Sequence, residues 1–375
     1  MKEKLNVLYL TSENTTTSIP LELANYLQAA DALNVTVVTY YGRVKGEPSG
    51  FSPNVIDLNI SKFRLKQIYT KINNLIKDTK PDVLHVHHNV SALISIIIAK
   101  KNKVKVIVKT EHNDHRFLKW HQKLLNIPIL FLADVVICNS VSTRNSFYTW
   151  EKLLAGKKAV PIYNGINVNK ILAYSGAENI RRVRAKYGVA DNEQMFFCAA
   201  RLIKQKNIDN LIRAFASATH KNSNIKLLIA GNGSLYNDLA ALKNELDVNK
   251  RIEFLGILPR EEVFNLMNAA DFFAVVSLWE GFCNAAVEAM IAGCPVLCSD
   301  IVTLREVVGE GTGYFANPES IESIEERILE LASLNGDKKE EAGRKSFERA
   351  FGLYNIEKTR DGHIKEYFRA YASKQ

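Results

Sequence analysis

The strongest constraint on the fold is an alternation of short β-branched runs with helix-favouring segments along most of the chain. Strands that alternate with helices predict parallel sheets covered by helices on both faces. Eleven strands are expected, at residues 6–10, 35–39, 83–86, 104–108, 135–137, 195–199, 226–230, 251–255, 272–276, 295–298 and 313–315. One open sheet of this type rarely holds so many strands, so we predict an α/β protein with two doubly wound, Rossmann-like domains.

A turn signal predicts the boundary between these domains. The segment 163–167, which reads Tyr-Asn-Gly-Ile-Asn, follows the last apolar run of the first half, and Asn-Gly is a strong turn former. We therefore expect a first domain at 1–167 and a second at 168–354. Ligands of doubly wound folds bind beyond the carboxyl ends of the strands, so two such domains facing each other would form a cleft.

Composition indicates an ordinary globular protein whose two halves differ in charge. Of its 375 residues 47% are hydrophobic and 24% charged, and no apolar run reaches the roughly 20 residues that span a bilayer. Residues 1–170 carry 23 Lys and Arg against 12 Asp and Glu, whereas residues 171–375 carry 26 against 28. The amphipathic basic segment 116–125 predicts either a solvated face or contact with an anionic membrane surface or an anionic acceptor. Nucleic acid is disfavoured as a partner because no binding motif accompanies the charge.

Cysteine and histidine patterns argue against a bound metal. The five cysteines lie in apolar contexts, which suits reduced thiols in a cytoplasm, and Cys294 and Cys298 lack a familiar zinc spacing. Histidines cluster in the segments 85–88 and 112–115. Alternating strand positions point to opposite faces, so these clusters do not form an obvious ligand set.

The start of the chain is interpreted as a strand, because no signal-peptide cleavage site follows it.

The most informative pair of residues is Glu280 and Glu288, which have seven residues between them. They bracket the start of a helix expected at 283–292, after an apolar strand. The N–H groups and positive dipole end of a helix favour an anion, and Gly281 permits close approach to the backbone. We expect a phosphate-bearing ligand here, with one carboxylate at a sugar and the other at a ribose.

Further candidates also follow predicted strands. Arg201 and Lys206 would project from a strand-end loop, where two cations could clamp a diphosphate in place of a metal ion. Taken alone, each would be interpreted as a surface residue that only keeps the protein soluble. The segment 231–233, Gly-Asn-Gly, resembles a dinucleotide fingerprint, but Tyr236 stands where a third glycine belongs, which disfavours a dehydrogenase. His112 either hydrogen-bonds a sugar or diphosphate or belongs to a polar loop.

In their order along the chain, these motifs resemble glycosyltransferase family 4, which comprises retaining enzymes of the two-domain GT-B fold. The resemblance rests on residues 81–87, 110–112, 133–136, 163–167, 200–206, 231–233, 254–256, 280–288, 293–296 and 304–308. It implies transfer of a hexosyl or N-acetylhexosaminyl unit from a nucleotide diphosphate sugar, with UDP favoured, to a glycan or lipid-linked glycan acceptor in cell-surface polysaccharide synthesis. It also implies that no metal cofactor is needed and that a helix at 355–375 packs back on the first domain.

The resemblance assigns roles residue by residue. Arg201 and Lys206 would neutralise the donor diphosphate. Glu288 would hold the ribose hydroxyls, Glu280 would lie near the donor sugar, and His112 would face the reacting centre. The other donor contacts would come from Gly281, Phe282, Cys283, Asn284, Gly233, Gly256 and Ile257.

The chain departs from the family pattern after its first strand. Residues 13–18, Glu-Asn-Thr-Thr-Thr-Ser, replace the family's glycine-rich loop. The hydroxyl of Thr16 or of Ser18 would substitute for its backbone contacts. Two alternatives to a transferase remain, because binding and chemistry share most of these residues. They are an inactive protein that binds a nucleotide sugar or glycan, and a nucleotide-sugar epimerase. We expect a cytoplasmic protein, peripheral at the inner face of the membrane.

Overall fold

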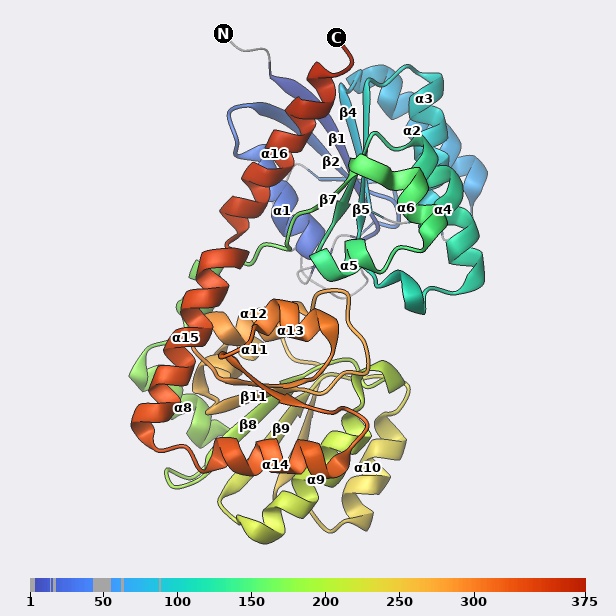
Figure 1. The fold of residues 1–375 in the computed structure, drawn as a ribbon. Coiled ribbons are helices and arrows are strands. Elements are labelled where there is room, and N and C mark those ends of the chain that lie inside the picture. Colours follow the sequence, from blue (N-terminus) through green and yellow to red (C-terminus); the bar gives the residue numbers. More distant parts are fainter. Residues whose placement is uncertain (1–3, 14, 16–17, 43–54, 62–63, 88) are drawn as a thin grey trace. The chain divides into compact units, whose positions relative to one another are not determined.

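The computed structural model describes residues 4–13, 15, 18–42, 55–61, 64–87 and 89–375. The chain divides into two compact units, Met1–Gly165 with Ile356–Gln375, and Ile166–Asn355 (Figure 1). The sequence analysis expected domain boundaries between residues 167 and 168 and between residues 354 and 355. The two units of the structure divide between residues 165 and 166 and between residues 355 and 356. No helix of the described residues has the length and apolar character needed to cross a membrane.

The first unit is built on a seven-stranded parallel sheet with the strand order β3-β2-β1-β4-β5-β6-β7. Its strands are β1 (Leu5–Thr11), β2 (Leu33–Thr39), β3 (Val55–Asp57), β4 (Val83–Val86), β5 (Val106–Glu111), β6 (Val135–Cys138) and β7 (Ala159–Pro161). Its α-helices are α1 (Ile19–Gln28), α2 (Leu65–Thr79), α3 (Asn89–Lys101), α4 (Trp120–Leu132), α5 (Val141–Asn145), α6 (Thr149–Ala155) and α16 (Ile356–Ala372).

Helices cover both faces of this sheet. One apolar cluster joins α1 and α16 to β1 and β5, and the other joins α2, α3, α4 and α6 to the opposite face. The last helix, α16, is fixed by Tyr367, which is fully buried and whose hydroxyl lies 2.6 Å from Nδ1 of His85 on β4. Gly165 lets the chain approach the start of α16, because a Cβ there would lie 2.4 Å from Cα of Ile356.

The second unit is built on a six-stranded parallel sheet with the order β10-β9-β8-β11-β12-β13. Its strands are β8 (Gln194–Ala199), β9 (Ile225–Ala230), β10 (Ile252–Gly256), β11 (Phe272–Val275), β12 (Val296–Ser299) and β13 (Gly313–Ala316). Its helices are α7 (Val168–Leu172), α8 (Ala177–Lys186), α9 (Ile208–Lys221), α10 (Tyr236–Glu245), α11 (Arg260–Ala269), α12 (Asn284–Ile291), α13 (Val302–Val308), α14 (Ile321–Ala332) and α15 (Gly336–Tyr354). The predicted architecture of two doubly wound α/β domains is confirmed.

The structure differs from the expected strands in two respects. Two edge strands, β3 and β7, were not predicted, because each has only three residues and no clear alternation. In addition, β5 runs to Glu111, so that Lys109 and Glu111 lie inside a fully buried strand. The sequence analysis had expected this strand at 104–108, so it placed Lys109 and Glu111 beyond the strand.

Candidate functional site

The strongest candidate site lies at the carboxyl ends of β8 and β11. These strands are parallel neighbours, with Phe272 beside Phe196, so the loops that follow them emerge at the same edge. Two hydrogen bonds join the loops: the backbone N–H of Leu278 donates to the Gln205 carbonyl at 2.8 Å, and Nε2 of Gln205 donates to the Trp279 carbonyl at 2.8 Å. The loop that carries Arg201 and Lys206 and the loop that carries Glu280 are therefore held together by hydrogen bonds.

An ion pair between Lys206 and Glu280 lies at the centre of this edge. Nζ of Lys206 is 2.5 Å from Oε1 of Glu280, and the two side chains are only 16% and 7% exposed. Burial lowers the pKa of Lys206, but the Glu280 carboxylate outweighs burial and the pKa is raised. Arg201, five residues earlier in the loop that follows β8, opposes this rise in the pKa of Lys206. Arg201 itself is exposed.

The start of α12 adds a helix N-terminus beside this pair. Cys283, the residue before the helix, has a left-handed backbone with φ of +75°. Burial and the Glu280 carboxylate raise the pKa of its thiol, which therefore stays protonated at neutral pH. The ring of Phe282 is buried against Tyr354 at a centroid distance of 5.3 Å. Because both side chains are buried, Phe282 and Cys283 can contact a ligand chiefly through their backbone.

Glu288 is held by a residue that the sequence analysis missed. Its carboxylate is 1% exposed and pairs with Nη2 of Arg260, the first residue of α11. The Arg260 guanidinium also lies over the ring of Phe264, 4.7 Å from its centroid. The signal was a cation directly after the turn at Gly256 and Ile257, where a base-binding loop was expected. Ile257 is 79% exposed.

The glycines of the segment 231–233 shape the loop that carries Arg201. A Cβ on Gly231 would lie 1.9 Å from the Ala200 carbonyl oxygen, and one on Gly233 would lie 2.3 Å from that of Leu202. The backbone N–H of Leu202 also donates to the Asn232 carbonyl at 3.0 Å. Gly233 therefore has a structural reason to be glycine, separate from the donor contact expected of it.

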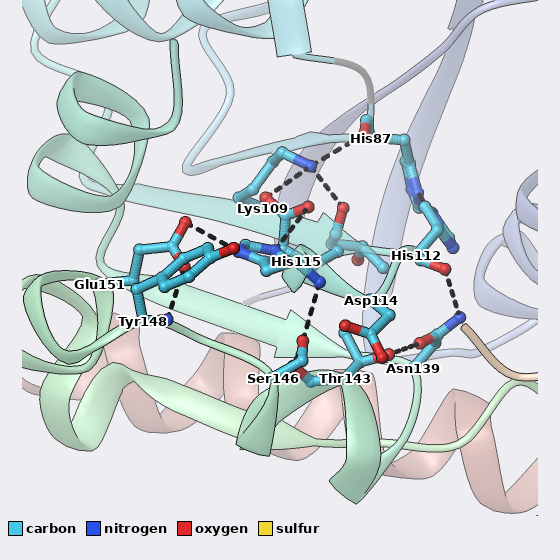
Figure 2. Close-up of polar contacts among 12 residues, drawn as sticks. His87, Lys109, His112, Asp114, His115, Asn139, Thr143, Ser146, Tyr148 and Glu151 are labelled. Carbon is cyan, nitrogen blue, oxygen red and sulfur yellow. Dashed lines mark hydrogen bonds and ion pairs between the residues drawn. The ribbon is translucent and has the colours of Figure 1, made fainter. Parts of the chain in front are cut away.

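His112 belongs to the first unit, where it follows β5 (Figure 2). Its Nε2 lies 2.9 Å from Nδ1 of His87, and the two rings are stacked with centroids 5.2 Å apart. Its carbonyl oxygen accepts a hydrogen bond from Nδ2 of Asn139 at 3.2 Å. The side chain is half-buried, so His112 combines a fixed ring orientation with partial access to solvent.

A buried charge network lies beside His112 and was also missed. Nζ of Lys109 is 3.2 Å from Glu111, and His115 is 2.8 Å from Glu151 and 3.7 Å from Glu111 (Figure 2). Burial raises the pKa of Glu111, but Lys109 and His115 outweigh it and lower the pKa to about 2. Burial lowers the pKa of His115, but Glu111 and Glu151 outweigh it and raise the pKa to about 9.

The remaining predicted residues are quickly placed. Thr16 lies outside the described residues. Within the described part of the chain, no group of three or more His, Cys, Asp and Glu side chains is arranged to hold a metal ion. The five cysteines are buried free thiols. Arg201, Lys206, Gly233, Gly256, Glu280 and Glu288 all belong to the second unit, and His112 to the first.

Comparison with known proteins places this arrangement in a family. Residues 20–170 match the family described as Glycosyltransferase Family 4, and residues 179–349 match Glycosyl transferases group 1. The chain belongs to glycosyltransferase family 4. Anabaena HepE, solved in complex with UDP and glucose, shares the GT-B fold of this family 4 chain with a TM-score of 0.79 at 18% identity. The likeness covers 96% of this chain and 98% of HepE.

Two relatives have informative names. The alpha-monoglucosyldiacylglycerol synthase of Streptococcus pneumoniae is 26% identical over 282 residues, which cover 71% of this chain and 63% of the relative. An Escherichia coli enzyme named UDP-Gal:alpha-D-GlcNAc-diphosphoundecaprenol alpha-1,3-galactosyltransferase is 26% identical over 296 residues, 74% of this chain and 75% of the relative. The chain spans 60% of the length of another relative, an uncharacterized glycosyltransferase of Methanocaldococcus jannaschii.

Proposed function

We propose that this protein is a retaining glycosyltransferase. It moves a hexosyl or N-acetylhexosaminyl unit from a nucleotide diphosphate sugar, preferably a UDP-sugar, to a glycan or lipid-linked glycan in cell-surface polysaccharide synthesis. The observation that carries the proposal is the convergence of Lys206, Glu280, Arg201 and the start of α12 at one sheet edge. Family membership supports it independently.

The charges at this edge suit a departing diphosphate. When the bond between the anomeric carbon and the phosphate oxygen breaks, negative charge develops on that oxygen, and fixed cations and a helix N-terminus stabilise it. The acceptor oxygen bonds to the anomeric carbon on the same face, and its proton passes to the departing phosphate. Lys206 and Arg201 would supply the positive charge that a metal ion supplies elsewhere, so we propose transfer without a metal cofactor.

Glu280 and Glu288 have distinct parts in this scheme. Glu280 fixes the ammonium of Lys206 and lies near the donor sugar. Glu288 accepts hydrogen bonds from the ribose hydroxyls, and its partner Arg260 holds the carboxylate oriented before the ligand arrives. His112 would contribute a hydrogen bond to the reacting sugar from the first unit.

The names of the relatives guide the choice of acceptor and location. The pneumococcal relative is named for a glucosylated diacylglycerol, and the E. coli relative for a sugar linked to diphosphoundecaprenol. We therefore propose a lipid-linked acceptor and a cytoplasmic protein working at the inner face of the membrane. The two rivals, a binding protein without activity and an epimerase, differ in their products.

The decisive experiment measures transfer from UDP-sugars and GDP-sugars to lipid-linked and free glycan acceptors. We expect free nucleotide diphosphate and a glycosylated product, in which nuclear magnetic resonance shows the donor's anomeric configuration retained. The rate should be unchanged by EDTA. Binding without product, or a new sugar epimer without acceptor, would instead establish one of the rivals.

A variant tests the diphosphate clamp. Arg201→Ala should lower kcat about 10²- to 10³-fold, the usual cost of removing one donor to a developing oxyanion. The matched control is Arg213→Ala, which removes another exposed arginine of the same unit. Equal rates for the two variants would remove Arg201 from the mechanism.

A further inference from the structure

Helix α4 of the first unit carries a stripe of exposed apolar side chains. Trp120 is 73% exposed, Leu124 55%, Ile127 42% and Phe131 67%. With 3.6 residues per turn, these four positions fall within about 60° of the helix circumference. The opposite side of α4, which includes Ile129 and Leu130, is fully buried in the core of the unit. The stripe is therefore the outward face of a firmly anchored helix.

More apolar surface adjoins the stripe. Phe117, in the turn before α4, is 51% exposed, and Leu153 on α6, which packs beside α4, is 85% exposed. Scattered exposed apolar residues are ordinary, but a contiguous row of this kind marks a surface that binds something. A large aromatic at each end, Trp120 and Phe131, is suited to the interface between headgroups and acyl chains.

Cations predominate around the stripe: the flanking carboxylates are Asp114, which pairs with Arg116, and Asp134, just after the end of α4. Residues 115–133 contain no Asp or Glu, whereas Arg116, Lys119 and Lys123 belong to this segment. On α6 and just after it, Lys152 and Lys157 are also exposed. A protein partner could be of either charge, but an apolar row flanked mainly by cations is complementary to an anionic lipid surface.

A basic cavity lies at the end of the stripe. It encloses about 460 Å³, and Phe131 is one of its lining residues. Its charged lining residues are Lys100, Lys158, Arg369, Lys374 and Asp134. Asp134 is shared between Lys374 at 2.8 Å and Lys100 at 3.5 Å, and Arg369 is paired with Glu366 at 2.7 Å. The cavity therefore keeps a net positive charge, which a lipid phosphate would balance.

The pKa of Lys158 reflects this excess of positive charge. Nζ of Lys158 donates to the carbonyl oxygens of Leu130, Phe131 and Ala133 at the end of α4. Burial lowers its pKa, and Lys100 and Lys374 lower it further, while Asp134 opposes them. Lys158, which contacts both the cavity and the end of α4, thus has two other cations, Lys100 and Lys374, near it.

We infer that α4 is a membrane-docking surface: the stripe of Trp120, Leu124, Ile127 and Phe131 enters the interface of an anionic bilayer, and the cavity at its end takes a phospholipid phosphate. This proposal does not depend on the transfer reaction. It would hold an enzyme with a lipid-linked acceptor at the surface where that acceptor is found.

Vesicle sedimentation, without donor or acceptor, tests the proposal. The full chain should bind vesicles that contain phosphatidylglycerol, bind those of phosphatidylcholine alone much more weakly, and be released by added salt. The double variant Trp120→Ser, Phe131→Ser should bind at least about tenfold more weakly. Its matched control is Phe351→Ser, on α15 of the second unit, where the ring is 47% exposed.

The cavity is tested by charge. Lys100→Ala and Lys374→Ala should each weaken binding to phosphatidylglycerol vesicles about fivefold, as expected for one lysine near an anionic surface, whereas Lys250→Ala on the second unit should not. The proposal is overturned if the wild-type protein does not bind anionic vesicles. A stripe variant that binds as wild type does also overturns it, and so does one that changes the molecular mass by light scattering, since the stripe would then join two copies of this chain. Thermal unfolding of each variant confirms that it is folded.

Discussion

The carboxyl edges of the two sheets use charge in opposite ways. In the first unit, Lys109 and His115 are buried beside Glu111 and Glu151, so each cation has a carboxylate partner in the core. In the second unit, Lys206 is joined to Glu280 at the mouth of the loops, and Arg201 beside it is exposed. A matched, buried network has little charge left for a ligand, whereas the second edge keeps a cation in reach of one.

The two edges therefore differ in whether the loss of a cation affects stability or catalysis. Removing one partner of a buried pair leaves the other ionised in a medium of low polarity, and the loss appears as stability. Removing a cation at an accessible edge leaves the fold intact, and the loss appears as turnover. Variants in the two units should therefore fail in different assays.

The largest effect is expected for His115→Asn. It removes the cation that Glu151 and Glu111 share, and should lower the free energy of unfolding by about 3 to 5 kcal/mol, as measured by urea denaturation. His121→Asn, on the exposed side of α4, should change it by less than about 0.5 kcal/mol. If both variants are equally stable, the first-unit network is not what holds that edge together.

The pH dependence of stability sharpens the same point. The pKa of His115 is raised to about 9, above its unfolded value, so its contribution is complete below about pH 6.5 and is lost as pH rises through 9. The pKa of Glu111 is lowered to about 2, so its contribution is complete above about pH 4.5 and is lost as pH falls toward 2. The gap between wild type and His115→Asn should shrink between pH 6.5 and 9. A constant gap over that range would mean that His115 is neutral in the fold.

Lys206→Ala should lower activity strongly, and it should also lower stability because it leaves the buried Glu280 carboxylate without its cation. It removes the ammonium nearest the expected diphosphate, and kcat should fall about 10²- to 10³-fold. Lys204→Ala removes an exposed lysine two residues earlier in the same loop, and should transfer sugar at nearly the normal rate. A Lys206→Ala protein that unfolds at much lower urea, yet turns over normally when folded, would make this pair structural and erase the contrast between the units.

The smallest effect is expected for Gly233→Ala. The new methyl group would meet the Leu202 carbonyl, so the loop with Arg201 must shift, at a cost of about 1 to 3 kcal/mol. Turnover should fall roughly in proportion to the misplacement of Arg201, up to about 10²-fold. Gly336→Ala, where a Cβ meets nothing within 4 Å, provides the control. Normal turnover in Gly233→Ala would show that the position of this loop is not critical.

The sequence predicted the fold well because periodicity is local. Runs such as residues 225–230 are short, apolar and β-branched, and their alternation with helices identifies two parallel sheets without any knowledge of long-range contacts. It also predicted that Glu280, Arg201 and Lys206 follow strand ends, since parallel strands bring such loops to one edge. The three-residue strands β3 and β7 were missed because so short a segment has no measurable period.

Partners far apart in sequence were beyond this reasoning. Glu151 meets His115 across 36 residues, and Arg260 meets Glu288 across 28, so each pairing depends on how helices pack rather than on any local pattern. One clue was present: Lys109 and Glu111 interrupt an apolar strand, and charges in such a place must be paired if the strand is buried. That clue predicts that partners exist, but it does not name them.

The position of α16 has a consequence for how the protein is made. The first unit starts to leave the ribosome before the second, yet the cover of one face of its sheet is completed only by residues 356–372, which are synthesised after the whole second unit. The second unit has all of its strands by residue 316 and can close earlier. The half that is translated first is thus completed last, and until then the apolar surface around Tyr9 and Val108 must be shielded in some other way.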